Sequence, residues 1–230
     1  MRQIILDTET TGLDPQQGHR IVEIACVEMI NRRLTRNNFQ SYLNPEREID
    51  PVAEQVHGLS LDFLSSKPVF REIAEAFLEY ISSAELIIHN APFDIGFLNA
   101  ELARLEKPPI NTLCKITDTL AMARELHPGR KNNLNALCER YQVDNAARTL
   151  HGALLDAELL ADVYLAMTRG QDSLAIGFEG GTDRAVEITP LQRPATLKVI
   201  RADEQERALH AAQIARIDKE SSGKALWKVF

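Results

Sequence analysis

The chain has 230 residues, of which 44% are hydrophobic and 26% charged, and its formal net charge is −7. This length is enough for one domain with its own hydrophobic core and an appended segment. No run approaches the ~20 apolar residues of a membrane span, and the N-terminus enters a strand without a signal peptide, so we expect a cytoplasmic protein with no membrane association. The three cysteines are far apart, which is typical of reduced core thiols and not of a disulfide framework or a zinc site.

The negative charge limits how the chain can bind nucleic acid. Proteins that grip long duplex DNA by its phosphates are normally basic, whereas the acidic excess here lies within residues 1–168. If the chain acts on nucleic acid, we expect it to hold a short end through metal ions, or to be brought there by a partner.

The first predicted element is a short buried strand, Ile4-Ile5-Leu6, which Asp7 and Glu9 follow directly. Because strand side chains alternate between faces, Asp7 and Glu9 are expected to point the same way. Two adjacent carboxylates repel each other unless a cation lies between them, and Mg²⁺ and Mn²⁺ prefer such oxygen ligands. A strand with two exposed acids is the simpler interpretation of an isolated Asp-x-Glu, so the rest of the chain must decide.

Apolar periodicity predicts an antiparallel meander followed by alternating helices and strands. Two further strands are predicted at 20–30 and 34–43, with a turn at 31–33 between them. The other predicted elements are a helix starting at Asp50-Pro51, a helix at 69–82, a strand at 85–89, a helix at 92–105, a strand or turn passing into a helix at 114–124, and helices at 134–141 and 152–168. This order predicts an α/β fold with a mixed sheet.

The composition changes after residue 168, where glycine and proline recur with little periodicity. We therefore predict a folded domain at 1–168, a flexible linker at 169–193 and a C-terminal segment at 194–230. A strand at 195–200 and a helix at 203–219 are expected in the last segment. It is too short to bury a core of its own, so we expect it to fold against another molecule.

Two more acids follow predicted strands or loops and lie in the first turns of predicted helices. Asp94 ends the run His89-Asn90-Ala91-Pro92-Phe93-Asp94, and Asp156 ends the run His151-Gly152-Ala153-Leu154-Leu155-Asp156. Sites collect at such junctions, although a favourable helix-dipole interaction also explains an acid there. His151 would be roughly 140° from Asp156 on one helix, so we expect it on the preceding loop, either as a proton acceptor or as an ordinary surface histidine.

Taken together, these residues form three motifs, which are Asp7-Thr8-Glu9, His89-Asn-x-x-Phe-Asp94 and His151-x-x-x-x-Asp156. The motifs resemble those of the DEDD 3′–5′ exonucleases, in the histidine-containing branch. Further matches at 27–34, 117–123, 148–157 and 163–168 resemble the family of proofreading subunits of bacterial replicative DNA polymerases. The resemblance covers residues 1–168 and implies a ribonuclease H-like fold with a five-stranded mixed sheet flanked by helices.

The resemblance implies two-metal phosphodiester hydrolysis that releases 5′-mononucleotides from a DNA 3′ end. Two Mg²⁺ or Mn²⁺ ions would be held by Asp7, Glu9, Asp94 and Asp156, and His151 would take the proton from the attacking water. His57 matches the position that reaches the terminal nucleotide. The other expected substrate-binding residues are Asp7, Thr8, Glu9, Thr10 and Asn90, and for the neutral ones a structural role stays open.

Partners also follow from the resemblance. Gln171–Ile176 resembles a sliding-clamp-binding peptide, and the C-terminal segment with Trp227 resembles one that docks on the polymerase catalytic subunit. A small accessory subunit is left open. The alternatives are an RNA-trimming 3′–5′ exoribonuclease, which a 60-residue tail disfavours, and a non-catalytic polymerase scaffold, which has no need of the complete set of acids and His151.

Overall fold

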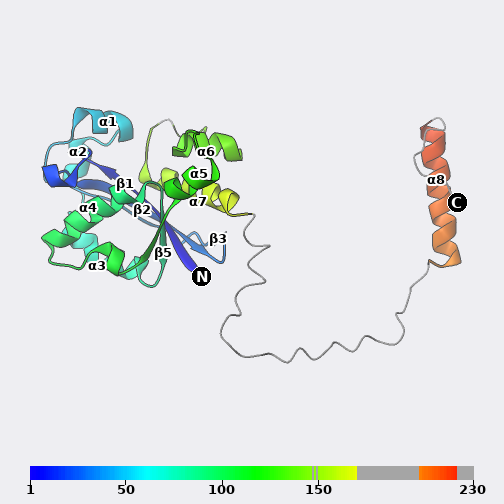
Figure 1. Ribbon diagram of the computed structural model, residues 1–230, viewed down its shortest axis with the longest axis horizontal. Helices are drawn as coiled ribbons and strands as arrows, with labels where there is room; N and C mark the ends of the chain where they lie inside the picture. The colour runs from blue at the N-terminus through cyan, green and yellow to red at the C-terminus, as the bar shows by residue number, and fades with distance from the viewer. Residues whose placement is uncertain (147, 149, 170–201, 222–230) are drawn as a thin grey trace, which may run out of the picture. The chain divides into compact units, whose positions relative to one another are not determined.

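We analysed a computed structural model that describes residues 1–146, 148, 150–169 and 202–221. The chain divides into two units, Met1–Gly180 and Gly181–Phe230. Within the described residues, the first unit contains every strand and the helices through α7 (Ala153–Met167), and the second contains α8 (Glu204–Glu220) (Figure 1).

A six-stranded mixed sheet forms the centre of the first unit (Figure 1). Its strands follow the order β3-β2-β1-β5-β6, and β4 pairs with β2. The central strand β1 is antiparallel to β2 and parallel to β5. The strands are β1 (Arg2–Thr10), β2 (Ile21–Ile30), β3 (Arg33–Leu34), β4 (Phe39–Tyr42), β5 (Glu85–Ile88) and β6 (Lys115–Asp118).

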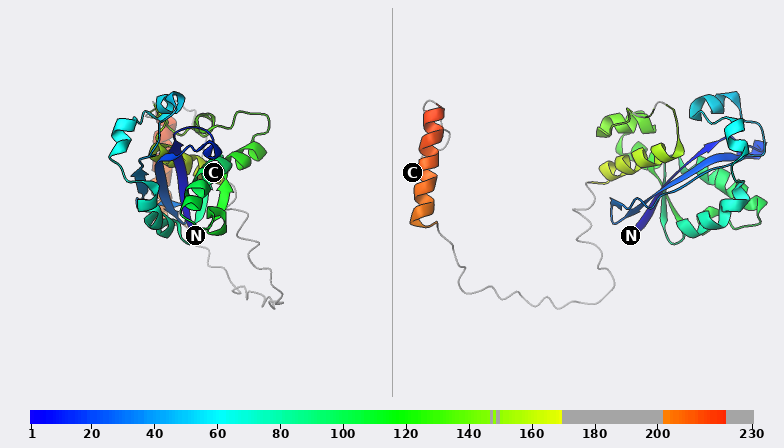
Figure 2. Two further views of the ribbon diagram at one scale, coloured as in Figure 1. Left: turned by 90° about the vertical axis from the view of Figure 1, so that its left-hand side faces the viewer. Right: turned by 180° about the vertical axis from the view of Figure 1, so that it is seen from behind.

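Helices pack on both faces of this sheet (Figure 2). One core joins Ile4 and Leu6 of β1 to α3 and α4, and the other joins Ile5 to residues of α5, α6 and α7. Each strand residue therefore faces one core or the other, as strand alternation requires. The helices are η1 (Pro15–Gln17), α1 (Pro51–His57), α2 (Leu61–Ser65), α3 (Phe70–Ile81), α4 (Ala91–Arg104), η2 (Ile110–Thr112), α5 (Thr119–Leu126) and α6 (Leu134–Tyr141), followed by α7 and α8.

Most predicted elements are confirmed to within two residues, but the expected five-stranded sheet is wrong. The strand predicted at 34–43 is broken, and its parts are β3 and β4. Between them Arg36 has a φ of 65°, and the side chains of Thr35 and Asn37 donate hydrogen bonds to Glu28. The side chains of this loop bond to β2, and the loop divides the predicted strand into two, so the sheet has six strands.

Two other local features differ from expectation. The helix α2 was not predicted, because it is five residues long and only Leu64 in it is buried. Asp50 precedes α1 as predicted but makes no capping hydrogen bond, and its carboxylate lies 3.6 Å from Nε2 of His19.

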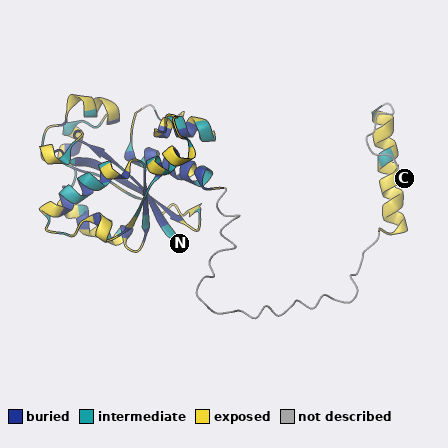
Figure 3. Cartoon of the chain, viewed as in Figure 1, coloured by how far each residue is buried: buried dark blue, intermediate teal, exposed yellow. Residues whose placement is uncertain are grey.

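The helix predicted at 203–219 is confirmed as α8. Asp203 caps it by accepting a hydrogen bond from the Glu206 backbone N–H at 2.7 Å. No residue of α8 is buried, and Leu209 is 65% exposed (Figure 3). The strand expected at 195–200, the Gln171–Ile176 peptide, Trp227 and nearly all of the predicted linker lie outside the described residues.

Among the described residues, no helix combines the length and the apolar character that crossing a membrane requires.

The core that α3 shares with the sheet allows a prediction of which side-chain truncations lower the stability of the fold. Phe77 is fully buried among β-strand residues, so Phe77→Ala is expected to lower the free energy of unfolding by about 3–5 kcal/mol. Urea denaturation measures this loss. Val52→Ala is the control, because Val52 is 73% exposed and its truncation should change stability by less than ~0.5 kcal/mol. A comparable loss in both variants would contradict the assigned core.

Candidate active site

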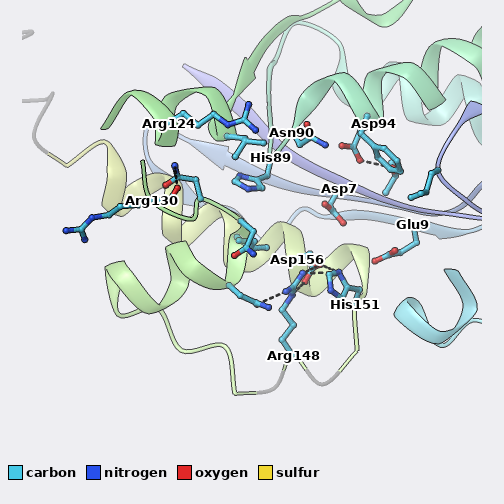
Figure 4. Close-up of a pocket in the computed structure, with 18 of the residues that line it drawn as sticks. Asp7, Glu9, His89, Asn90, Asp94, Arg124, Arg130, Arg148, His151 and Asp156 are labelled. Carbon is cyan, nitrogen blue, oxygen red and sulfur yellow. Dashed lines mark hydrogen bonds and ion pairs between the residues drawn. The ribbon is translucent and has the colours of Figure 1, made fainter. Parts of the chain in front are cut away.

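Asp7 and Glu9 lie in the C-terminal half of β1, on the face that α7 covers. Their antiparallel partners on β2 are Ala25 and Glu23. Both carboxylates point into one cavity, as the strand alternation predicts (Figure 4). Thr8, between them, points to the opposite face.

Asp94 reaches this cavity from the first turn of α4. The Thr8 hydroxyl donates a hydrogen bond to Asp94 Oδ1 at 2.7 Å, which joins the two elements. Asn90, just before α4, has a φ of 68°, a left-handed conformation that asparagine tolerates. Its backbone N–H donates to Asp118 at 3.1 Å, and its exposed side chain lies at the cavity wall.

Asp156 lies in the first turn of α7, and His151 lies on the loop before that helix, as predicted. His151 Nδ1 is 3.3 Å from Asp156 Oδ2, and the histidine side chain is 46% exposed. The His151 backbone N–H donates to the Val56 carbonyl at 3.0 Å, which attaches the loop to α1. Glu9, His151 and Asp156 each place a ligand atom within 4.8 Å of the other two. Asp7 and Asp94 line the same cavity but do not join this close cluster.

Arg148 is a cavity residue that the sequence analysis did not single out for a role. Its Nε and Nη2 donate to the two carboxylate oxygens of Asp156, each at 2.5 Å. Nη2 also lies 3.0 Å from His151 Nδ1, and Nη1 donates to Asn135 at 2.6 Å. The side chain is only 6% exposed. One indication in the sequence that Arg148 belongs to the site is its place three residues before His151. Periodicity does not predict the direction of a side chain on a loop, so the contact with Asp156 could not be foreseen.

His57 and Thr10 lie beside a second, smaller cavity of about 350 Å³ next to Glu9. His57 Nδ1 accepts a hydrogen bond from the Leu59 backbone N–H at 3.0 Å, and its buried Nε2 makes no well-formed hydrogen bond to any described residue. Burial lowers the pKa of His57. The Thr10 hydroxyl donates to the Gly12 carbonyl at 2.6 Å, so this hydroxyl already has a structural partner.

The main cavity has a volume of about 1020 Å³ and contains all four predicted metal-binding acids. It continues from His151 past His89 to Arg124 and Arg130 (Figure 4). The cavity is therefore acidic around β1 and basic at its far end.

Burial raises the pKa values of Asp7, Glu9 and Asp94, and repulsion from neighbouring carboxylates adds to each rise. Burial is the largest cause of the raised pKa of Asp7, which lies well above its ordinary value, and repulsion from the neighbouring Asp94 is the next largest cause. Burial also raises the pKa of Glu9 to about 8 and that of Asp94 to about 7. A cluster that retains protons near neutral pH is one that divalent cations would stabilise in its ionised form. The donor set therefore fits hard metal ions.

The pKa of His151 shifts in the opposite direction. Burial lowers it, and the Arg148 guanidinium lowers it further, while Asp156 opposes both effects. His151 is therefore neutral at pH 7 and able to accept a proton.

The raised pKa of Glu9 predicts how the metal-free protein responds to pH. Between the ordinary pKa of 4.5 and the folded value of about 8, the folded state binds more protons than the unfolded state. The free energy of unfolding in EDTA should therefore fall as the pH rises through this window. The Glu9→Gln variant has no proton to release in this pH window, so its free energy of unfolding should not fall in this way. At pH 8 the variant should therefore be more stable than wild type by ~1–3 kcal/mol.

Thermal denaturation in EDTA at pH 5 and pH 8 tests this. The exposed Glu79 supplies the control variant Glu79→Gln, which should match wild type at both values. Equal stability of Glu9→Gln and wild type at pH 8 would contradict the assigned burial of the carboxylate.

Comparisons with known proteins place this geometry in a family. The family model described as Exonuclease matches residues 4–164. DNA polymerase III subunit epsilon of Salmonella typhimurium is 51% identical over 99% of this chain and 97% of the relative. The same subunit of Rickettsia felis is 58% identical over 75% of this chain and 76% of the relative.

A solved structure agrees with the sequence comparisons. Exonuclease X in complex with 5′ overhanging duplex DNA superposes with a TM-score of 0.59 at 26% identity, over 74% of this chain and 93% of that one. The chain therefore belongs to the exonuclease family and, within it, to the DNA polymerase III epsilon subunits.

Proposed function

We propose that this chain removes mispaired nucleotides from DNA 3′ ends as the proofreading 3′–5′ exonuclease of a replicative DNA polymerase. The observation that carries the proposal is the convergence of Asp7, Glu9, Asp94 and Asp156 in one cavity with a neutral histidine at its edge. Family membership gives the reaction class, and the site supplies residues for each role.

The four acids are the proposed ligands of two Mg²⁺ or Mn²⁺ ions. Asp7 lies between Asp94 and the cluster of Glu9 and Asp156 (Figure 4), so it is the residue suited to serve both ions. When bound, such ions activate a water molecule and stabilise charge on the attacking and leaving oxygens. Thr8 holds Asp94 in place through its hydroxyl.

His151 is the proposed proton acceptor. Its ring is partly exposed, neutral and adjacent to Asp156. The backbone bond to Val56 fixes the loop, while the side chain keeps access to the cavity. A general base needs this combination of a fixed backbone and an accessible, unprotonated nitrogen.

The smaller cavity is the proposed site of the terminal nucleotide. It is mainly apolar, borders Glu9 and has His57 in its wall. The hydroxyls of Thr8 and Thr10 are already donated to Asp94 and Gly12, so contacts from these residues to the nucleotide would come chiefly from their backbone. Val52 lines the same cavity and offers an apolar contact.

The upstream strand is proposed to follow the main cavity towards its basic end. Arg124 and Arg130 line that end and would contact phosphates, while Asn90 would contact the nucleotide or a phosphate beside Asp94. This division keeps basic side chains away from the metal ligands, with Arg148 as the exception.

The remaining assignments rest on sequence and family membership. We propose an exonuclease domain at 1–168, a linker at 169–193 and a polymerase-binding segment at 194–230, in a cytoplasmic replication assembly. The sliding clamp would bind Gln171–Ile176, and whether a small accessory subunit binds the catalytic domain stays open. The exposed apolar side chains of α8, Leu209 and Ile217, support a docking role for the C-terminal segment.

The first activity test uses 5′-labelled single-stranded DNA and a matched RNA, with Mg²⁺, Mn²⁺ or EDTA. We expect metal-dependent shortening of the DNA from its 3′ end, and at least a ~10³-fold loss for the double variant Asp7→Ala, Glu9→Ala. The control pair is Asp62→Ala, Glu79→Ala, two exposed acids outside both cavities. Activity confined to RNA would favour the exoribonuclease alternative, and no activity on either would favour the scaffold.

Arg148 gives a separate prediction, because its guanidinium occupies both carboxylate oxygens of a proposed metal ligand. Hydrogen bonds to charged groups are worth ~1.5–3 kcal/mol, so Arg148→Gln should tighten Mn²⁺ binding by about tenfold. Isothermal titration calorimetry measures the affinity. Arg140→Gln is the control, because Arg140 bonds to Asn132 and to the Lys131 carbonyl instead of to the acids. Weaker binding by Arg148→Gln would show that the arginine supports the metal site instead of competing for it.

A further inference from the structure

Glu23 is a buried carboxylate for which the proposed mechanism has no role. It lies on β2 directly opposite Glu9, and its exposed fraction is 1%. Opposite residues of an antiparallel pair share a face, so Glu23 faces α7 as Glu9 does. The position is electrostatically unfavourable, because burial and the charge of Asp156 both raise the pKa of Glu23.

The partners of Glu23 explain what a carboxylate does there. Oε1 accepts a hydrogen bond from Gln40 Nε2 at 2.7 Å, and Oε2 accepts one from the Ala153 backbone N–H at 3.1 Å. Ala153 is the first residue of α7, and Gly152 before it has no side chain to cap the helix. The α7 N-terminus is therefore capped from the sheet, by a residue 130 positions away in sequence.

This cap links the elements that carry the two halves of the acidic cluster. Glu9 is on β1, paired with Glu23, while Asp156 and His151 lie within a few residues of Ala153. A bond from the Glu23 side chain to Ala153 fixes the start of α7 over the sheet at the position of Glu9.

We propose that Glu23 is a positioning residue, whose hydrogen bond to the Ala153 N–H sets the distance between Glu9 and the Asp156–His151 pair and thereby the affinity of the metal site. The inference rests on the proposed function, because it concerns the same acids. It assigns the effect to the acceptor atom of Glu23 and not to its charge.

Two substitutions of Glu23 separate these properties. Glu23→Leu removes both charge and acceptor, while Glu23→Gln removes the charge but keeps an acceptor oxygen of similar reach. The leucine itself adds no buried polar group, but it leaves the Ala153 N–H and the Gln40 amide without their acceptor, so folding of this variant has to be measured. Glu28→Leu is the matched control: Glu28 is also buried on β2, at 6% exposure, but on the opposite face, with Arg2, Thr35 and Asn37 as partners.

Ala153→Pro tests the same bond from its donor side. Proline is tolerated at the first position of a helix, and Gly152 before it has the extended backbone that proline requires. Its Cδ replaces the N–H that points at Glu23, so the bond is lost and the carboxylate is displaced. This variant keeps Glu23 intact, so a shared phenotype with Glu23→Leu cannot come from the loss of the glutamate alone.

The experiment is calorimetric titration of the full chain with Mn²⁺, with circular dichroism to establish that each variant is folded. Loss of groups that orient metal ligands typically costs ~10–100-fold in affinity, and we expect this for Glu23→Leu and Ala153→Pro. Glu23→Gln should stay within ~3-fold of wild type, and Glu28→Leu should match it. The turnover of a DNA oligonucleotide should fall in parallel with little change in KM.

Each outcome decides one of the two proposals. Wild-type affinity in both Glu23→Leu and Ala153→Pro would overturn the positioning role while leaving the exonuclease proposal intact. An equal loss in Glu23→Gln and Glu23→Leu would overturn it as well, by assigning the effect to charge. If wild type itself binds no Mn²⁺ and shortens no DNA, both proposals fail. Should Glu23→Leu not fold, the comparison of Ala153→Pro with Glu23→Gln decides in the same way.

Discussion

The withdrawal of Asp7, Glu9 and Asp94 from water in one cavity, with added repulsion from neighbouring carboxylates, is the constraint on which the rest of the structure depends. Asp7, Glu9 and Asp94 lie in a desolvated cavity where their ionised forms are disfavoured, and the pKa values of all three are raised. Such a cluster persists only if its members are attached to elements that cannot move apart. The central strand and the first turns of two helices provide these attachments. Divalent cations stabilise the ionised form of such a cluster, and the 3′–5′ exonuclease reaction requires cations of this kind.

The two helices are anchored by tertiary contacts at the ends that face the site. Neither Asn90 before α4 nor Gly152 before α7 makes a side-chain capping hydrogen bond. Asp118 instead fixes the Asn90 backbone, and Glu23 accepts from the first amide of α7. Each helix start is therefore connected to a neighbouring strand, and the helix dipoles favour the acids in their first turns. The fold positions the acids through these connections more than through local helix propensity.

Sequence periodicity predicted much of this architecture because its signals are local. The alternation in β1 placed Asp7 and Glu9 on one face, and the helical spacing located α3, α6 and α7 closely. The off-helix place of His151 followed from its spacing to Asp156. Motif order and spacing then identified the family, which composition alone would not have done.

What sequence reasoning missed depends on contacts between distant residues. The break between β3 and β4 involves side-chain bonds to Glu28, and the Arg148–Asp156 pair depends on how a loop folds back. The bond between Glu23 and Ala153 spans 130 residues and has no local pattern. The five-stranded expectation failed for this reason, whereas the acids that line the main cavity belong to short contiguous motifs that a sequence displays directly.

The most direct test of the account is to locate the ions themselves. Crystals of the full chain grown with Mn²⁺ and a nucleoside 5′-monophosphate would be measured near the manganese absorption edge. The account predicts two anomalous peaks among the acids, one contacted by Asp7, Glu9 and Asp156 and the other by Asp7 and Asp94, with Arg148 withdrawn from at least one oxygen of Asp156. A map with no peak among these carboxylates would contradict the central claim.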